Sequence, residues 1–275
     1  MDRVASEAFF LARAPGSRFC ILHRPANAAP RGAMLYVHPF AEEMNKTRRM
    51  ASLGARALAA EGWAVLLIDL AGCGDSTGDF GEASWDAWRG DLRAAWDWLA
   101  ARFGGAQWLW GLRAGCLLAG EAAKAMEPKP RLLLWQPVLS GKQHLAQFLR
   151  LRLARESLDG AAERAGTQAL RAELAAGRAL DIAGYSLAPA LALGLEAAEL
   201  DLAGYPAEVK WLEVASGDPP ELGPASRAKV SGWIEGGTKV DSLAVSGPAF
   251  WQTVEITECS ALLDATLSAF AAQSQ

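Results

Sequence analysis

The stretch that most constrains the fold is a short turn between two apolar segments. Residues 107–110 form an apolar run, and 114–126 is rich in Ala, Leu and Gly; the turn Gly111-Leu112-Arg113-Ala114-Gly115 joins them. Glycines that flank such a turn allow a strand and a helix to approach closely, so the central side chain projects above the sheet. The stretch therefore predicts a buried strand, a sharp turn and a helix, with Arg113 at the point of the turn.

Strand-like and helix-like segments alternate on both sides of this turn. Apolar runs at 33–37, 63–68, 107–110 and 132–135 are separated by helix-forming segments at 47–61, 84–103 and 114–126. Unalternating apolar runs are typical of strands that are covered on both faces. The alternation itself is typical of a parallel sheet with right-handed crossovers. Two further strands, 8–12 and 18–22, flank Pro15-Gly16-Ser17 and are expected to pair antiparallel at the sheet edge.

The alternation breaks in the second half of the chain. From about 141 to 204 the sequence holds only helix-forming segments, after which strands are expected at 209–214 and 230–234 and a helix at 258–270. We therefore expect three parts: a first core part over 1–140, a helical cap insertion over 141–204, and a second core part over 205–275.

Composition excludes several classes of partner and site. The chain has 275 residues and a net charge of -4, so it has no field that attracts nucleic acid or an anionic membrane surface. No run of about 18 apolar residues is present, so we expect no membrane span and a cytoplasmic protein. The four cysteines are far apart and no histidine lies at ligand spacing, so no metal and no cofactor are expected.

Four landmarks occur in the order in which α/β-hydrolases carry them, and over its whole length the chain resembles that family. His38-Pro39-Phe40 resembles the turn after the third strand, where a backbone amide helps to form the oxyanion hole, and the Gly-rich loop 69–78 resembles the loop after the fourth strand. The turn 111–115 occupies the place of the nucleophile elbow, G-x-S-x-G, and 141–204 that of the cap. The resemblance implies an α/β-hydrolase fold: a central, mostly parallel sheet flanked by helices, with a helical cap insertion.

A finer resemblance concerns four short segments. Gly-Leu-Arg113-Ala-Gly, 147–152, Ala183-Gly184-Tyr185 and 247–251 are similar to the exosortase A system-associated hydrolase 2 type. Such proteins are encoded with exopolysaccharide and PEP-CTERM protein-sorting systems. This resemblance implies that a protein of the exosortase/exopolysaccharide system is a partner.

The sequence departs from the family triad of Ser, acid and His at two of the three positions. Arg113 stands at the nucleophile position, and a guanidinium is always protonated and only donates hydrogen bonds, so it cannot attack a carbonyl. The acid position maps onto Asp218. Gly247-Pro248-Ala249-Phe250 stands where the closing His belongs, and all three histidines of the chain precede Asp218. The triad is therefore degenerate.

Two functions lead for such a chain, and a structural component of the exosortase/exopolysaccharide pathway is a third alternative. The first is a pseudo-hydrolase that binds a small anionic or acyl-bearing ligand or a protein partner, and the second is an ester or thioester hydrolase with a non-serine mechanism. In the second case His38 or Asp218 would activate water over a substrate held by Arg113. His38 otherwise only shapes its turn. The expected ligand and oxyanion region comprises Phe40, Glu42, Glu43, Cys73 and Ala114.

Cys73 and Arg113 each carry an alternative interpretation. Cys73 is either a substitute nucleophile, if His38 or Arg113 lowers the pKa of its thiol, or an ordinary reduced thiol in its Gly-rich loop. Arg113 is either a ligand clamp or part of an internal ion pair, because a guanidinium under a cap loses water and requires a counter-charge. We expect that charge from Asp218 first, since no His occupies its carboxylate, and otherwise from Glu42 or Glu43.

Overall fold

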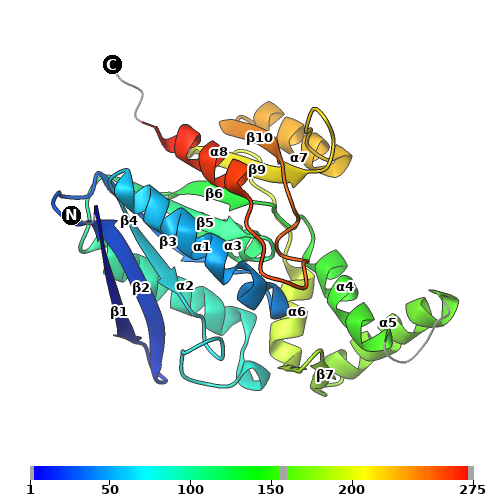
Figure 1. The fold of residues 1–275 in the computed structure, drawn as a ribbon. Helices are drawn as coiled ribbons and strands as arrows, with labels where there is room; N and C mark the ends of the chain where they lie inside the picture. The colour runs from blue at the N-terminus through cyan, green and yellow to red at the C-terminus, as the bar shows by residue number, and fades with distance from the viewer. Residues whose placement is uncertain (1–2, 155–159, 272–275) are drawn as a thin grey trace.

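The computed structural model describes residues 3–154 and 160–271, and an eight-stranded sheet lies at its centre (Figure 1). The strands are β1 (Val4–Ala12), β2 (Ser17–Pro25), β3 (Gly32–Val37), β4 (Trp63–Ile68), β5 (Ala106–Leu112), β6 (Arg131–Trp135), β9 (Val209–Ala215) and β10 (Val240–Ser246). Their order across the sheet is β1-β2-β4-β3-β5-β6-β9-β10. β2 pairs antiparallel with β1 and β4, and every other neighbouring pair is parallel. The predicted mostly parallel sheet with an antiparallel edge is confirmed.

Helices cover both faces of this sheet. They are α1 (Glu42–Ala60) and α8 (Ser260–Phe270) on one face, and α2 (Trp85–Ala100), α3 (Gly115–Ala125) and α7 (Pro224–Glu235) on the other. Within β5, Trp108 and Trp110 belong to the core layer under α1 and α8, whereas Leu109 belongs to the opposite layer. This alternation follows from the two-residue period of a strand. Because β4, β3, β5, β6, β9 and β10 are parallel, their carboxyl ends lie together at one edge of the sheet.

The segment between β6 and β9 contains α4 (Gly141–Leu153), α5 (Gly160–Ala175), β7 (Leu180–Ile182), β8 (Tyr185–Leu187) and α6 (Pro189–Ala197). The sequence predicted helices alone here, and the hairpin of β7 and β8 is a difference. Its turn residues Ala183 and Gly184 both have positive φ, at 50° and 88°, as a two-residue hairpin turn of type I′ requires. Strands of three residues are too short to show an alternation of apolar and polar residues, so the sequence pattern did not predict this hairpin.

The expected strand at 230–234 is wrong, because these residues lie in α7. Val230 and Trp233 are buried three positions apart on one face of that helix, and Pro224 stands in its first turn. The last strand is β10, whose residues are only partly buried at the sheet edge. This edge strand contains polar residues and so forms no continuous apolar run, which is why the sequence did not predict it. In the part of the chain that the structure describes, no helix is long and apolar enough to cross a membrane.

Candidate functional site

The turn between β5 and α3 has the geometry that its glycines predict. Arg113 adopts a left-handed backbone with φ of 55°, which is rare for a residue with a side chain. A Cβ on Gly115 would lie 2.3 Å from the Val37 oxygen, and one on Gly111 would lie 2.7 Å from the Cys116 Cα. The Arg113 N–H donates to the Trp135 oxygen at 3.0 Å. Both flanking positions therefore require glycine, and the side chain of Arg113 projects from the turn.

Glu43, in the first turn of α1, supplies the counter-charge of Arg113. Arg113 Nη2 lies 3.0 Å from Glu43 Oε1, and Arg113 Nε lies 3.2 and 3.3 Å from the two carboxylate oxygens. The two side chains are only 13% and 10% exposed. The Trp251 ring lies 5.3 Å from the guanidinium carbon, within cation-π range. The expected counter-charge is present, but Glu43 provides it rather than Asp218, the acid we favoured.

A pocket of about 280 Å³ lies over this ion pair, and α1, α4 and the loop after β10 contribute to its walls. Its lining comprises Phe40, Glu42, Glu43, Lys46, Arg113, His144, Gln147, Phe148, Leu151, Trp251 and Gln252. Two cations thus face two carboxylates. Among the described residues, Glu42 Oε2 and His144 Nδ1 are buried and accept or donate no hydrogen bond. Both residues line the pocket, but these two atoms are shielded from solvent, so they are unpaired polar atoms within its wall.

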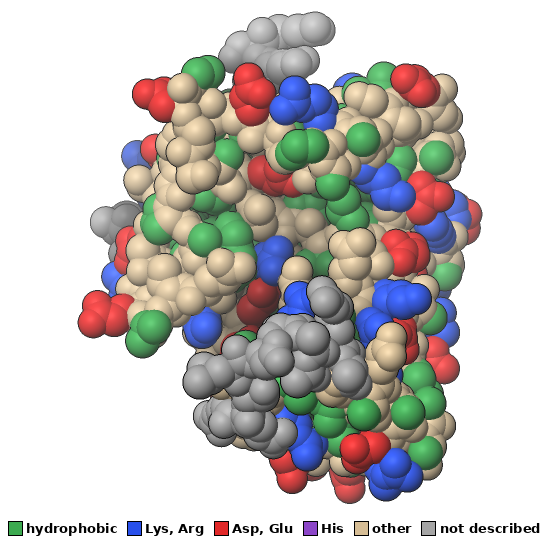
Figure 2. All heavy atoms as spheres, turned by 90° about the vertical axis from the view of Figure 1, so that its right-hand side faces the viewer, with side chains coloured by type: hydrophobic (Ala, Val, Ile, Leu, Met, Phe, Trp, Pro, Cys, Tyr) green, Lys and Arg blue, Asp and Glu red, His purple; other side chains and the backbone are tan. Residues whose placement is uncertain are grey.

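Charges of both signs also alternate over the surface around the segment 141–204. Figure 2 views the molecule from the side on which α4 and α5 lie in Figure 1, and there Lys/Arg and Asp/Glu side chains are interspersed. Interspersed charges produce little net field. Any recognition of a charged ligand on this side is therefore local to the pocket.

Burial shifts the pKa values of three residues that line the pocket. It raises the pKa of Glu43 even though the neighbouring Arg113 charge lowers it, and it also raises the pKa of Glu42. It lowers the pKa of His144 to about 3, with a further lowering from Arg113. The imidazole of His144 is therefore neutral near pH 7. The sequence analysis missed His144, because its only signal is a place on the buried face of α4.

His38 has contacts at both ring nitrogens. Nδ1 lies 2.7 Å from the Pro39 oxygen, and Nε2 accepts the Leu70 N–H at 3.3 Å. Nδ1 therefore carries the proton, and the ring is buried and bound to its own loops. The hypothesis of His38 as a base stays a prediction, and these contacts favour the alternative that it shapes the turn.

Asp218 and Cys73 lie outside the pocket of Arg113. Asp218 is exposed on the loop after β9, and its neighbours Gly217 and Pro219 line a different, more open pocket. Cys73 is 7% exposed, and burial raises the pKa of its thiol well above the usual range. A protonated, buried thiol is a poor nucleophile. In the described ranges, no group of three His, Cys, Asp or Glu side chains is placed to hold a metal ion.

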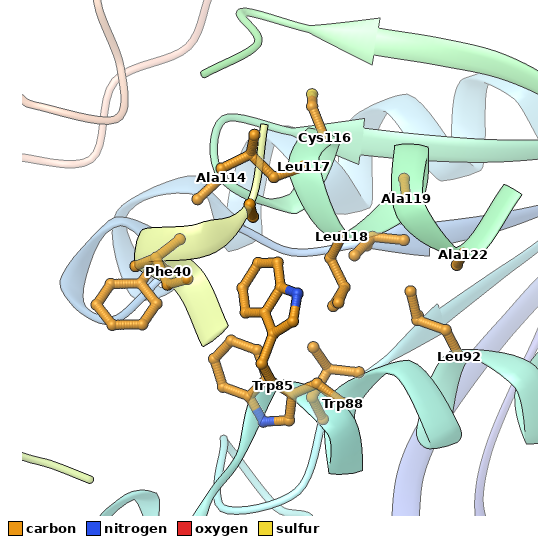
Figure 3. Packing of buried hydrophobic residues seen from close by; sticks show 14 of the residues in the cluster. Phe40, Trp85, Trp88, Leu92, Ala114, Cys116, Leu117, Leu118, Ala119 and Ala122 are labelled. Atoms are coloured by element: carbon orange, nitrogen blue, oxygen red, sulfur yellow. The ribbon is translucent and has the colours of Figure 1, made fainter. Parts of the chain in front are cut away.

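Two further residues of the expected ligand and oxyanion region, Phe40 and Ala114, are buried beside Arg113. Phe40 and Ala114 are 2% and 3% exposed, and in the described ranges neither backbone N–H donates a hydrogen bond. Figure 3 shows Phe40 and Ala114 beside the packed side chains of Trp85, Trp88 and Leu118. The rings of Phe40 and Trp88 are 6.1 Å apart in an edge-on arrangement. This packing fixes the backbone of both residues next to Arg113.

Comparisons with known structures agree with this fold. Est1E from Butyrivibrio proteoclasticus, whose structure holds ferulic acid, superimposes with a TM-score of 0.67 at 16% identity, over 96% of this chain and 98% of that one. A serine hydrolase without lid from Xanthomonas campestris gives 0.56 at 18% identity, with 98% and 97% covered. A thermostable carboxyl esterase from Bacillus coagulans gives 0.58 at 14% identity, with 88% and 90% covered. At these identities the likeness shows the fold alone.

The sequence itself matches one protein family. The family described as "Serine aminopeptidase, S33" matches over residues 28–172, which is more than half of the chain. No functionally curated protein matches significantly. The matched range contains the turn 38–40, α1 with Glu43, the Gly-rich loop and Arg113. The chain therefore belongs to the serine aminopeptidase S33 family and has the α/β-hydrolase fold.

Proposed function

We propose that this protein is a degenerate member of its family that binds a ligand beside Arg113 and has lost serine-hydrolase chemistry. One observation carries the proposal: the elbow presents a guanidinium held by Glu43, where a nucleophile would need a free hydroxyl. Trp251 and Gln252 line the pocket from the loop that would supply a closing His. None of the described lining residues is a serine.

The ligand is a small anionic or acyl-bearing molecule. Arg113 Nη1 has no hydrogen-bond partner among the described residues and remains for a ligand oxygen. The N–H groups of Phe40 and Ala114 are two further donors near the same turn. Phe148 and Trp251 offer apolar surface for a chain or ring. Burial raises the pKa of Glu43 and Arg113 lowers it, so an anion that draws Arg113 away from Glu43 would raise this pKa further.

The remaining parts of the proposal rest on the sequence resemblance. The protein acts in the cytoplasm with a protein of the exosortase/exopolysaccharide system, and the segment 141–204 serves as its cap. The contribution of α4 residues His144, Gln147 and Phe148 to the pocket supports the role as a cap.

A second candidate function is atypical ester or thioester hydrolysis. It is favoured by His144, a neutral imidazole with a buried, unpartnered Nδ1 in the same pocket as Arg113. With a pKa of about 3 and a shielded Nδ1, His144 is a weak base in this structure, so this route requires substrate binding to expose the ring to water and raise its pKa while Arg113 polarises an acyl oxygen.

Activity and binding assays separate the two candidates. We expect no labelling by a fluorophosphonate and no turnover of p-nitrophenyl acetate, p-nitrophenyl octanoate or octanoyl-coenzyme A. Turnover of any of these that is lost in His144→Phe would support the second candidate instead. Stoichiometric labelling mapped to any serine of the chain would refute both.

Binding is tested directly with acetate, butyrate, octanoate and inorganic phosphate in calorimetric titrations. Arg113→Ala should weaken binding by about 1.5 to 3 kcal/mol, which is about 10- to 150-fold. Arg89→Ala is the matched control, since Arg89 is a half-exposed surface arginine paired with Asp86. Equal affinities of the wild type and Arg113→Ala would place the ligand elsewhere.

A further inference from the structure

A second cavity, of about 160 Å³, lies on the other side of α1. Strands β2, β3 and β4 form its floor, and α1 covers it through Met44, Arg48, Ala51 and Ser52. Met44 and Ala51 are buried, whereas Arg48 is exposed, so the cavity reaches the surface at Arg48. It shares no lining residue with the pocket of Arg113. The two spaces are therefore separate sites.

The interior of this cavity is apolar and has the size of one aromatic ring. Ile21 and Leu67 line it from β2 and β4, opposite Met44 and Ala51 of α1. An engineered apolar cavity of roughly 150 Å³ in another protein stays dry and binds benzene. Tight packing is the rule in protein interiors, so an open apolar space of this volume favours a ligand over water. The body of that ligand is apolar and about as large as benzene.

The polar groups of the cavity are balanced in charge. Arg48 Nη2 donates to Asp69 Oδ2 at 2.9 Å, and the same oxygen accepts the Asp75 N–H at 3.1 Å. Asp69 is buried, while the Arg48 side chain is 42% exposed. His23 and His38 also line the cavity, and burial lowers the pKa of both, so both rings are neutral near pH 7.

A charged ligand would lack a counter-ion in such a place. An ammonium would compete with Arg48 for Asp69, and a carboxylate would compete with Asp69 for Arg48. A neutral hydroxyl avoids this cost, because it can donate to Asp69 and accept from Arg48 without breaking the pair. We propose that this cavity is a second ligand site, which binds a neutral alcohol with a single aromatic ring, the ring under α1 and the hydroxyl at Arg48 and Asp69.

The methyl group of Met44 is a direct reporter for this site. The chain has five methionines; Met44 lines the cavity, whereas Met126 does not line it and follows α3, a helix on the opposite face of the sheet. In protein labelled with ¹³C-methyl methionine, benzyl alcohol should shift the Met44 signal saturably and leave that of Met126 in place. The signal is assigned with Met44→Leu. Benzoate and benzylamine, which have the same ring, should bind at least tenfold more weakly.

Two filling variants and one control test the location. Ala51→Leu adds three carbon atoms to the cavity from α1. If this variant does not fold, Ile21→Phe fills the cavity from the other side, because Ile21 is a half-buried residue of β2. Each should weaken benzyl alcohol binding at least tenfold, whereas Arg113→Ala should leave it unchanged. An unmoved Met44 signal, equal binding of the three probes, or full binding by a folded filling variant would overturn the proposal. The result is independent of the function proposed for the Arg113 pocket.

Discussion

Glu43 contacts the guanidinium of Arg113 with both carboxylate oxygens, although the two residues are 70 positions apart in the chain. The contact joins the N-terminal turn of α1 to the turn that precedes α3. It neutralises the one cation at the position where related enzymes carry a nucleophile. An incoming anion therefore meets a compensated charge, and must use the remaining N–H groups of Arg113 or displace Glu43.

A double-mutant cycle should measure this contact. Glu43→Ala or Arg113→Ala alone leaves one largely buried charge without its partner and should lower the free energy of unfolding by about 2 to 4 kcal/mol. The double variant should lose less than the sum, with a coupling of about 1 to 3 kcal/mol in urea unfolding. Glu42→Gln is the control, because Glu42 Oε2 has no described partner to lose. Additive losses would contradict the contact.

Arg113→Ser should not create an efficient esterase. The variant would restore a hydroxyl at the elbow, but both nitrogens of His38 are bound to backbone groups and no His follows Asp218. A nucleophile and its base act as a unit, so a serine without a base gains little. Hydrolysis of p-nitrophenyl acetate should rise by less than tenfold over the wild type. A gain of a hundredfold or more would show that His144 or another group already serves as the base.

His144 should make the protein less stable in acid. Its pKa is lowered to about 3 by burial and by Arg113, whereas an unfolded histidine titrates near 6.5. Below about pH 6.5 the unfolded state binds a proton that the folded state does not. This group should therefore cost about 1.4 kcal/mol of stability per pH unit as the pH falls from 6 toward 3.

The comparison with His144→Phe isolates this effect. His23 and His38 also have lowered pKa values and act in the same direction, while the raised pKa values of Glu42 and Glu43 act in the opposite direction. These groups are common to both proteins, so the difference in unfolding free energy reports His144. A difference that does not change between pH 7 and pH 4 would mean that His144 has the same pKa in the folded and unfolded states, which would contradict the lowered pKa.

The four cysteines should be unreactive until the protein unfolds. Cys20, Cys73, Cys116 and Cys259 are free and buried, and burial raises the pKa of each thiol. Their thiolate fraction near pH 8 is therefore small. Ellman's reagent should modify all four in guanidinium chloride and none within minutes in native buffer. Fast reaction of Cys73 with Ellman's reagent in native buffer would support the hypothesis that Cys73 acts as a nucleophile.

The sequence alone determined the elbow and the sheet around it. Gly111 and Gly115 are required by contacts with residues a few positions away or in the next strand, and apolar runs predict buried strands without knowledge of their partners. The spacing of these glycines marks the turn within five residues, although the contact that excludes a side chain at Gly115 is with Val37, far away in the chain. The Arg at its centre was visible for the same reason.

Only the tertiary structure decided what Arg113 meets. Three carboxylates were open as its partner, and the approach of α1 to the elbow selected Glu43 while Asp218 stayed exposed on its loop. His144 entered the pocket because α4 packs over it, which no local pattern encodes. Likewise, 230–234 became a helix because Val230 and Trp233 pack together against the sheet. Burial and pairing of charges depend on contacts between distant segments, and these exist only after the chain has folded.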